Sequence, residues 1–473
     1  MSTSLPEALL RSLSKLSHFD PQAFLAAHEM EQPLVSVHMN SGKPILDEGQ
    51  WPARFTDPPF EISGPVPWAC DGWYLSRRPS FTLDPLFHAG GYYVQEASGM
   101  FLSYVLRQTL DLSKKIKALD LCAAPGGKST MIQSHLSADS LLVSNEVIKT
   151  RVPVLYENMT KWGRANGVVT QNDPVHFKQV PDFFDLMLID APCSGSGLFR
   201  KDPEAMVKWS PELVGHCCQR QHRILQDVWD SLKEGGLLIY STCSYSKEEN
   251  EDVLDWVFQH QPCSSLALFP NPAWGIVETR ADLSGAYGYR FYPDKLSGEG
   301  FFLSVLRKEG TRGSGTGQVQ TRTVKISNHP ERISKTAEKQ LKHWIRDGAV
   351  QYVPVGEAIH GIPQGLVDDF NRLKNALYLK KAGIRLGKSG ENDWIPDHEL
   401  ALADILSENQ HCLNLEKKEA LEFLQGNSLE LGQGERGWCL VRYEGLGLGW
   451  VKLLDKRINN YYPKSWRIRQ SIF

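Results

Sequence analysis

The stretch that decides the fold is Asp120-Leu-Cys-Ala-Ala-Pro-Gly-Gly-Lys-Ser-Thr130, which follows an apolar run and leads into a segment with helical character. A strand that passes through a glycine-rich turn into a helix predicts an α/β nucleotide pocket, because backbone N–H groups of the turn and helix start face the ligand. The stretch ends like a phosphate-binding P-loop, but Cys122 stands where that motif has its first glycine. The turn alone therefore leaves the nucleotide open.

Further apolar runs around this stretch alternate with helical or loop segments. We expect strands at residues 117–122, 141–145, 167–171, 186–190 and 236–241, and a helix over residues 211–232. Strands that alternate with helices indicate βαβ units and a mostly parallel sheet covered on both faces. We therefore predict a doubly wound α/β domain with its ligand crevice at the carboxyl ends of the strands.

Two smaller regions flank this domain. The first hundred residues combine helical patterns with a strand at residues 34–40 and a helix that opens at Gly91 and continues to about Leu110, which predicts a small α/β module. Residues 308–323 are rich in Gly, Thr and Ser and predict a linker or an exposed loop. Short alternating strands near the C-terminus predict a β-rich module, and its basic and aromatic tail suits RNA.

The composition indicates a globular enzyme from a reducing compartment. The mean hydropathy is −0.34, and no apolar run reaches the ~18 residues that a membrane span needs. Nine cysteines without paired spacing predict neither a disulfide scaffold nor a metal site. We expect a cytoplasmic protein with no membrane partner. Because the formal net charge is −3, any nucleic-acid surface has to be a local patch.

Two cysteines are placed at the ends of two expected strands. Cys193 follows Asp190-Ala-Pro, and Cys243 follows Ser241-Thr. The carboxyl ends of strands in a doubly wound sheet open into the ligand crevice, so we expect both thiols to face the pocket of the glycine-rich turn. The pattern favours a functional pair over inert core cysteines, and it leaves open which thiol is the nucleophile.

Acidic residues follow four of the expected strands, namely Asp120, Glu146, Asp173 and Asp190. An acid at the position of Glu146 can accept both hydroxyls of a ribose, a role that a P-loop enzyme does not need. Asp173 is placed to accept from an adenine amino group. We interpret the four acids as the rim of a binding site.

Three motifs in consistent order make the interpretation specific. Residues 122–128 (CAAPGGK), 190–195 (DAPCSG) and 240–244 (YSTCS) together resemble the NOL/NOP/Sun family of RNA cytosine-5 methyltransferases. Residues 93–98 and 298–302 are similar to the same family. The tail, at residues 449–452 and 460–464, resembles the branch that acts on bacterial small-subunit ribosomal RNA. The resemblance covers nearly the whole chain and is strongest over residues 90–305.

The resemblance implies a Rossmann-like methyltransferase sheet that binds S-adenosylmethionine. It implies Cys243 as the nucleophile and Cys193 as a second cysteine associated with product release. The family commonly has an arginine where this chain has His38, which puts one RNA-backbone contact in doubt. The implied cofactor-binding residues are Cys122, Ala123, Ala124, Pro125, Gly126, Gly127, Lys128, Glu146, Asp173 and Asp190.

The same resemblance implies the organisation of the chain. We expect an N-terminal RNA-positioning module at residues 1–105, a catalytic domain at residues 106–310, a linker at residues 311–325 and a C-terminal RNA-binding region with a PUA-like end at residues 326–473. The expected partner is RNA, with small-subunit ribosomal RNA preferred and transfer RNA as the nearest alternative. We expect a monomer.

The chemistry of such an enzyme requires covalent catalysis, because C5 of cytosine is too weak a nucleophile to take a methyl group directly. Addition of a thiolate at C6 makes C5 reactive. Asp190 is the candidate for stabilising charge at N3, and either Cys193 or a bound water removes the C5 proton. Two alternatives are a P-loop NTPase, which Cys122 and Pro125 disfavour, and a non-catalytic ribosome-assembly factor of the same fold.

Overall fold

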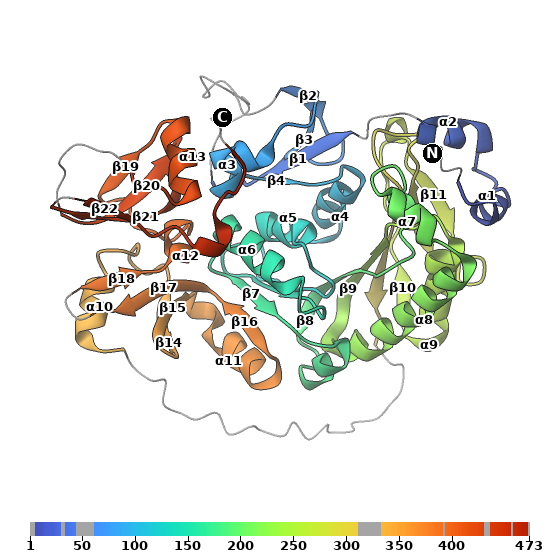
Figure 1. The fold of residues 1–473 in the computed structure, drawn as a ribbon. Coiled ribbons are helices and arrows are strands. Elements are labelled where there is room, and N and C mark those ends of the chain that lie inside the picture. The colour runs from blue at the N-terminus through green and yellow to red at the C-terminus, as the bar shows by residue number, and fades with distance from the viewer. Residues whose placement is uncertain are drawn as a thin grey trace.

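A ten-stranded mixed sheet forms the centre of the computed structural model, which describes residues 5–29, 34–43, 61–310, 333–390, 393–429, 436–455 and 457–471 (Figure 1). Its middle is a parallel set in the order β9–β8–β5–β6–β7, and antiparallel strands extend both edges. The parallel strands are β5 (Lys117–Asp120), β6 (Leu141–Asn145), β7 (Gly167–Thr170), β8 (Phe184–Asp190) and β9 (Leu232–Thr242). The antiparallel strands that extend it are β10 (Cys263–Ser265), β11 (Val277–Arg280), β12 (Tyr287–Phe291), β13 (Phe301–Lys308) and β16 (Leu379–Ala382). The doubly wound α/β prediction is confirmed.

The parallel strands are buried on both faces, which explains why their sequences are almost continuously apolar. Ala118 and Leu188 belong to the core formed with α4 (Phe101–Thr109) and α5 (Gly127–His135). Leu119 belongs to the core on the other face, formed with α8 (Pro211–Val228) and α9 (Glu251–His260). The helix expected over residues 211–232 ends earlier, at Val228, because Leu232 begins β9. The strand order reverses between β5 and β8, and a ligand crevice opens at such a switch point.

The N-terminal module is built on a four-stranded antiparallel sheet in the order β2–β3–β1–β4. Its elements are α1 (Glu7–Leu13), α2 (Pro21–Glu29), β1 (Val35–Met39), β2 (Ile62–Pro65), β3 (Gly72–Leu75), α3 (Pro85–His88) and β4 (Tyr92–Val94). The sequence predicts a helix that opens at Gly91, and the first part of this prediction is wrong. Tyr92–Val94 form a strand that pairs with β1, and α4 begins only at Phe101. Aromatic and β-branched side chains at these positions favour the strand.

The C-terminal region holds two more four-stranded sheets, which confirms a β-rich module. The first sheet contains β14 (Gln351–Val355), β15 (Ala358–Ile362), β17 (Ile384–Ser389) and β18 (Trp394–Pro396). The second contains β19 (Cys412–Asn414), β20 (Gly437–Tyr443), β21 (Leu446–Leu454) and β22 (Arg457–Asn460). The helices are α10 (Lys335–Leu341), α11 (Val367–Ala376), α12 (His398–Ala401) and α13 (Lys417–Gln425). The linker predicted at residues 311–325 lies outside the described residues. No helix in the described parts of the chain has the length and apolar character that a membrane crossing requires.

The flanking regions pack on the catalytic domain and on each other. Val37 of β1 shares a hydrophobic core with Phe423 of α13 and Val451 of β21, and these elements lie together in Figure 1. A second junction lies at the end of α6 (Val152–Trp162). There Lys43 donates from Nζ to the Lys161 carbonyl at 2.5 Å. The N–H of Asp404 donates to the carbonyl of Gly163, the residue that follows α6, at 2.9 Å. The three parts of the chain therefore meet beside α6.

Gly163→Ala should lower the free energy of unfolding by about 3 kcal/mol, because it adds left-handed backbone strain and a steric clash. The φ of Gly163 is +84°, and a Cβ there would lie 2.2 Å from the carbonyl oxygen of Leu402. Gly285→Ala is the matched control: its φ is +68°, but nothing lies within 4 Å of the added Cβ, so only about 1 kcal/mol is expected. Urea unfolding measures both, and equal losses would contradict a role for the close approach at Gly163.

Candidate active site

The glycine-rich turn lies between β5 and α5, and its outer side is held by α6. Asn158 donates from Nδ2 to the Pro125 carbonyl at 2.8 Å, and Arg151 donates to the Ala124 carbonyl. Gly126 has a φ of +120°, which L side chains rarely adopt, and it turns the chain into α5. No side chain of the described residues caps α5, so the N–H groups of its first turn are left for a ligand.

Two buried carboxylate oxygens at this crevice have no hydrogen-bond partner. Glu146 accepts from the Ile148 N–H at 2.8 Å through Oε1, whereas Oε2 makes no hydrogen bond, although Arg151 is an ion-pair partner at 3.3 Å. Asp120 accepts from Ser129 Oγ at 2.6 Å through Oδ2, and its Oδ1 has no partner. Burial raises the pKa of Asp120 to about 7. Because buried acceptors require donors, these oxygens fit the hydroxyl and ammonium groups of S-adenosylmethionine.

Lys128 reaches across the crevice to the end of β8. Its Nζ lies 2.8 Å from Oδ2 of Asp190, whose Oδ1 accepts from Ser241 Oγ at 2.8 Å. The ammonium also lies 5.2 Å from the centre of the Phe301 ring. Burial opposes the charge, but the Asp190 carboxylate outweighs it and raises the pKa of Lys128. The crevice therefore holds a fixed ion pair, which the sequence motif did not reveal.

The two predicted cysteines lie side by side beyond this ion pair. Their Sγ atoms are 3.0 Å apart, and both are free thiols. They meet because β8 and β9 are parallel neighbours in the register Asp190↔Ser241, with Cys243 directly after β9 and Cys193 three residues beyond β8. The contact with Cys243, together with burial, raises the pKa of Cys193. The arrangement favours a protonated Cys193 that donates to the sulfur of Cys243.

Glu249 joins the two cysteine loops, a role that the sequence alone does not reveal. Its Oε1 accepts from the Ser194 N–H at 2.7 Å, and its Oε2 accepts from the hydroxyls of Ser194 and Ser244 at 2.6 and 2.5 Å. Each serine directly follows one of the two cysteines. The sequence suggests instead a capping box from Ser246 to Glu249, but the Ser246 side chain makes no cap hydrogen bond. One buried carboxylate therefore fixes the separation of the two thiols.

Asp173 and His38 each have partners within the chain. Asp173, beyond β7, accepts from the Val175 N–H at 3.1 Å and from Arg223 at 2.9 Å, and its contact with adenine stays a prediction. His38 is fully buried, and its ring centroid lies 5.6 Å from that of Tyr93. Burial lowers the pKa of His38 to about 3. The neutral, buried imidazole packs the module against α5, where its Nε2 lies 3.3 Å from Thr130 Oγ1.

Comparison with known families accounts for most of the chain. Residues 107–307 match the family described as 16S rRNA methyltransferase RsmB/F, residues 5–97 match the N-terminal domain of 16S rRNA methyltransferase RsmF, and residues 410–468 match the methyltransferase RsmF PUA domain. Ribosomal RNA small subunit methyltransferase F of Escherichia coli O157:H7 is 30% identical over 493 residues, which cover 98% of this chain and 95% of that protein. The chain belongs to the RsmF family of 16S rRNA methyltransferases. The protein of the same name from Aliivibrio fischeri is 28% identical, with 97% of both chains covered.

Solved structures share the fold of the central part. A methyltransferase homolog from Pyrococcus horikoshii is 27% identical with a TM-score of 0.51, covering 64% of this chain and all of that one. NSun6 from Pyrococcus horikoshii, solved with the S-adenosylmethionine analogue SFG, is 18% identical with a TM-score of 0.53. It covers 64% of this chain and 98% of its own, and at this identity the likeness shows the fold alone.

Family membership makes the chain an S-adenosylmethionine-dependent RNA methyltransferase, so the P-loop NTPase alternative is wrong. Cys122, which interrupts the P-loop pattern, belongs to a turn whose lysine pairs with Asp190 instead of a phosphate. Within the described residues, no group of three or more His, Cys, Asp or Glu side chains could hold a metal ion.

Glu249→Ala should lower the rate of methyl transfer about 30-fold, because three buried donors lose their acceptor and the cysteine loops lose their common anchor. Affinity for S-adenosylmethionine, measured by calorimetry, should change less than about twofold, since Glu249 does not touch the glycine-rich turn. The exposed neighbour Glu248 supplies the control variant, Glu248→Ala, which should transfer at the native rate. A native rate of methyl transfer in Glu249→Ala as well would show that Glu249 does not position the two cysteines for the reaction.

Proposed function

We propose that the protein transfers a methyl group from S-adenosylmethionine to C5 of a cytosine in small-subunit ribosomal RNA through a covalent adduct between Cys243 and C6. The observation that carries the proposal is the pair of free thiols 3.0 Å apart beside the Lys128–Asp190 ion pair. RNA methylation at a base nitrogen or a ribose hydroxyl needs no thiol, whereas C5 of a pyrimidine needs a nucleophile at C6.

S-adenosylmethionine supplies an electrophilic methyl group when it is bound. The glycine-rich turn, residues 122–128, would hold it from one side, and Glu146 would accept from the ribose hydroxyls through Oε2, which makes no hydrogen bond in this structure. Asp120 would accept from the ammonium end. Asp173 would contact the adenine. The support for this assignment is the burial and the missing hydrogen-bond partners of Glu146 and Asp120.

The thiolate of Cys243 adds to C6, and the electron pair of the C5–C6 double bond moves into the ring toward N3. A proton shared between Asp190 and Lys128 forms a hydrogen bond to N3 and stabilises the charge that builds there. C5 then takes the methyl group. A base removes the C5 proton: a bound water can do so directly, and Cys193 only after its own thiol proton has left. The electrons of that C–H bond restore the double bond as Cys243 leaves. The neighbouring Cys193 thiol is placed to return a proton to the departing sulfur.

Ribosomal RNA is favoured over transfer RNA by the relatives, whose names specify the small ribosomal subunit and which match along nearly the whole length of this chain. The matches at residues 5–97, 107–307 and 410–468 support an RNA-positioning module, a catalytic domain and an RNA-binding end. The proposed bounds are residues 1–105, 106–310 and 326–473. We also propose a monomer in the cytoplasm, where two thiols this close stay reduced.

Cys243→Ala should abolish methyl transfer to small-subunit RNA, because it removes the thiolate that adds to C6. S-adenosylmethionine should still bind with an affinity within about twofold of the native one. A tritium-transfer assay measures the first, and calorimetry the second. Cys70→Ala, at an exposed cysteine, is the control and should keep full activity. Residual transfer by Cys243→Ala would exclude Cys243 as the nucleophile, and a native protein without any transfer would favour an assembly factor.

Cys193→Ala should accumulate the covalent protein–RNA adduct, because the thiol that assists release of Cys243 is absent. The adduct appears as a band of lower mobility on a denaturing gel and disappears in the double variant Cys193→Ala, Cys243→Ala. If the adduct forms instead in Cys243→Ala and depends on Cys193, the two cysteines have exchanged roles.

A further inference from the structure

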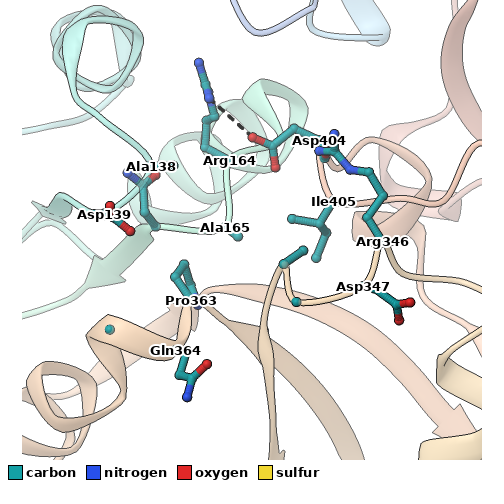
Figure 2. Close-up of a pocket in the computed structure, with 14 residues that line it drawn as sticks. Ala138, Asp139, Arg164, Ala165, Arg346, Asp347, Pro363, Gln364, Asp404 and Ile405 are labelled. Carbon is teal, nitrogen blue, oxygen red and sulfur yellow. Dashed lines mark hydrogen bonds and ion pairs between the residues drawn. The ribbon is translucent and has the colours of Figure 1, made fainter.

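Two pockets of similar size lie outside the cysteine crevice, and their linings differ in charge. The first, of about 470 Å³, lies between the catalytic domain and the C-terminal region (Figure 2). Carboxylates of Asp139, Asp347 and Asp404 surround it, against the guanidinium groups of Arg164 and Arg346. It lies before β6 and β7, at the amino ends of the strands and away from the crevice. Its lining does not suit a polyanion.

The second pocket, of about 420 Å³, lies between the N-terminal module and α6. Aromatic rings of Phe81, Phe87 and Tyr93 line it together with the guanidinium of Arg78 and the amide of Asn158. None of its described lining residues is acidic. Rings that can stack on a base, with a cation for phosphate and an amide for base edges, are the groups that bind unstacked nucleotides.

Two residues that line this second pocket also contact the glycine-rich turn. Asn158 lines the pocket and donates to the Pro125 carbonyl at 2.8 Å. Tyr93 lies against the same turn, since a Cβ added to Gly127 would be 3.0 Å from its Cε1. A group bound in the pocket therefore lies on the other side of the residues that hold the methyl donor.

Arg78 is available for an anion. It is exposed, its guanidinium carbon lies 5.5 Å from the centre of the Phe81 ring, and no carboxylate among the described residues forms an ion pair with it. Arg77 beside it is exposed as well. The pocket thus has a positive mouth in a chain whose overall charge is −3.

We propose that this pocket binds one unstacked nucleotide of the RNA strand that carries the target cytosine. The base stacks on Phe87 and Tyr93, and its phosphate pairs with Arg78. The pocket then places the strand relative to the glycine-rich turn while the target base enters the cysteine crevice. The proposal rests on the RNA substrate of the proposed function and assigns the N-terminal module a direct contact with that substrate.

Photocrosslinking tests the occupant without requiring activity. Small-subunit ribosomal RNA transcribed with 4-thiouridine is irradiated with the full chain, and crosslinked peptides are identified by mass spectrometry. The proposal predicts crosslinks in the peptide that spans residues 78–94. Crosslinks confined to the C-terminal region would contradict nucleotide binding in the pocket, whether or not the protein proves to be a cytosine-5 methyltransferase.

Kinetics of pocket variants provide the second test. Thr82→Trp, at an exposed lining position, fills the pocket, and Arg78→Glu reverses the charge at its mouth. Each should raise the KM for RNA about tenfold or more and leave kcat and the affinity for S-adenosylmethionine within twofold. Arg77→Glu is the matched control for charge alone and should raise the KM less than Arg78→Glu.

Equal KM values for Arg78→Glu and Arg77→Glu, with a native KM in Thr82→Trp, would show that the pocket does not bind a nucleotide. The proposed function would stay intact. If the native protein transfers no methyl group, the proposed function fails, and crosslinks at residues 78–94 still decide whether RNA occupies the pocket.

Discussion

Parallel pairing of β8 with β9 is the constraint on which the site depends. Hydrogen bonding in the register Asp190↔Ser241 carries two loops to the same point, so that the thiols of Cys193 and Cys243 come within 3.0 Å of each other. Strand pairing alone leaves loops free to diverge, and the buried carboxylate of Glu249 joins them through three hydrogen bonds. A change of one residue in register would turn one thiol to the opposite face of the sheet.

The side of the crevice that the glycine-rich turn forms depends on a different set of contacts. The glycine-rich turn is supported from outside by α6 through Asn158 and Arg151, and α6 also ends at the junction that joins the flanking regions to the catalytic domain. Lys128 connects this side to the cysteine side through Asp190. The glycine-rich turn, the Lys128–Asp190 ion pair and the two thiols are therefore parts of one connected arrangement, and the surfaces that would meet RNA are fixed to it.

Much of this arrangement follows from the sequence. Apolar runs predict the five parallel strands, because buried strands need continuous apolar side chains, and the ends of those strands carry Asp120, Glu146, Asp190 and the two cysteines. Contacts between distant residues have no such local signal. Glu249 looks like part of a helix cap, and only its approach to Ser194, 55 positions away, reveals its role. Tyr92–Val94 look like a helix start until β1 is present to pair with them.

We propose that this crevice methylates C5 of a cytosine in small-subunit ribosomal RNA. Bisulfite sequencing of that RNA tests it most directly, in a strain that lacks the gene and in the same strain complemented with the chain. The structure predicts that 5-methylcytosine disappears from at least one position in the deletion strain and returns on complementation. An identical 5-methylcytosine pattern in both strains would contradict the claim.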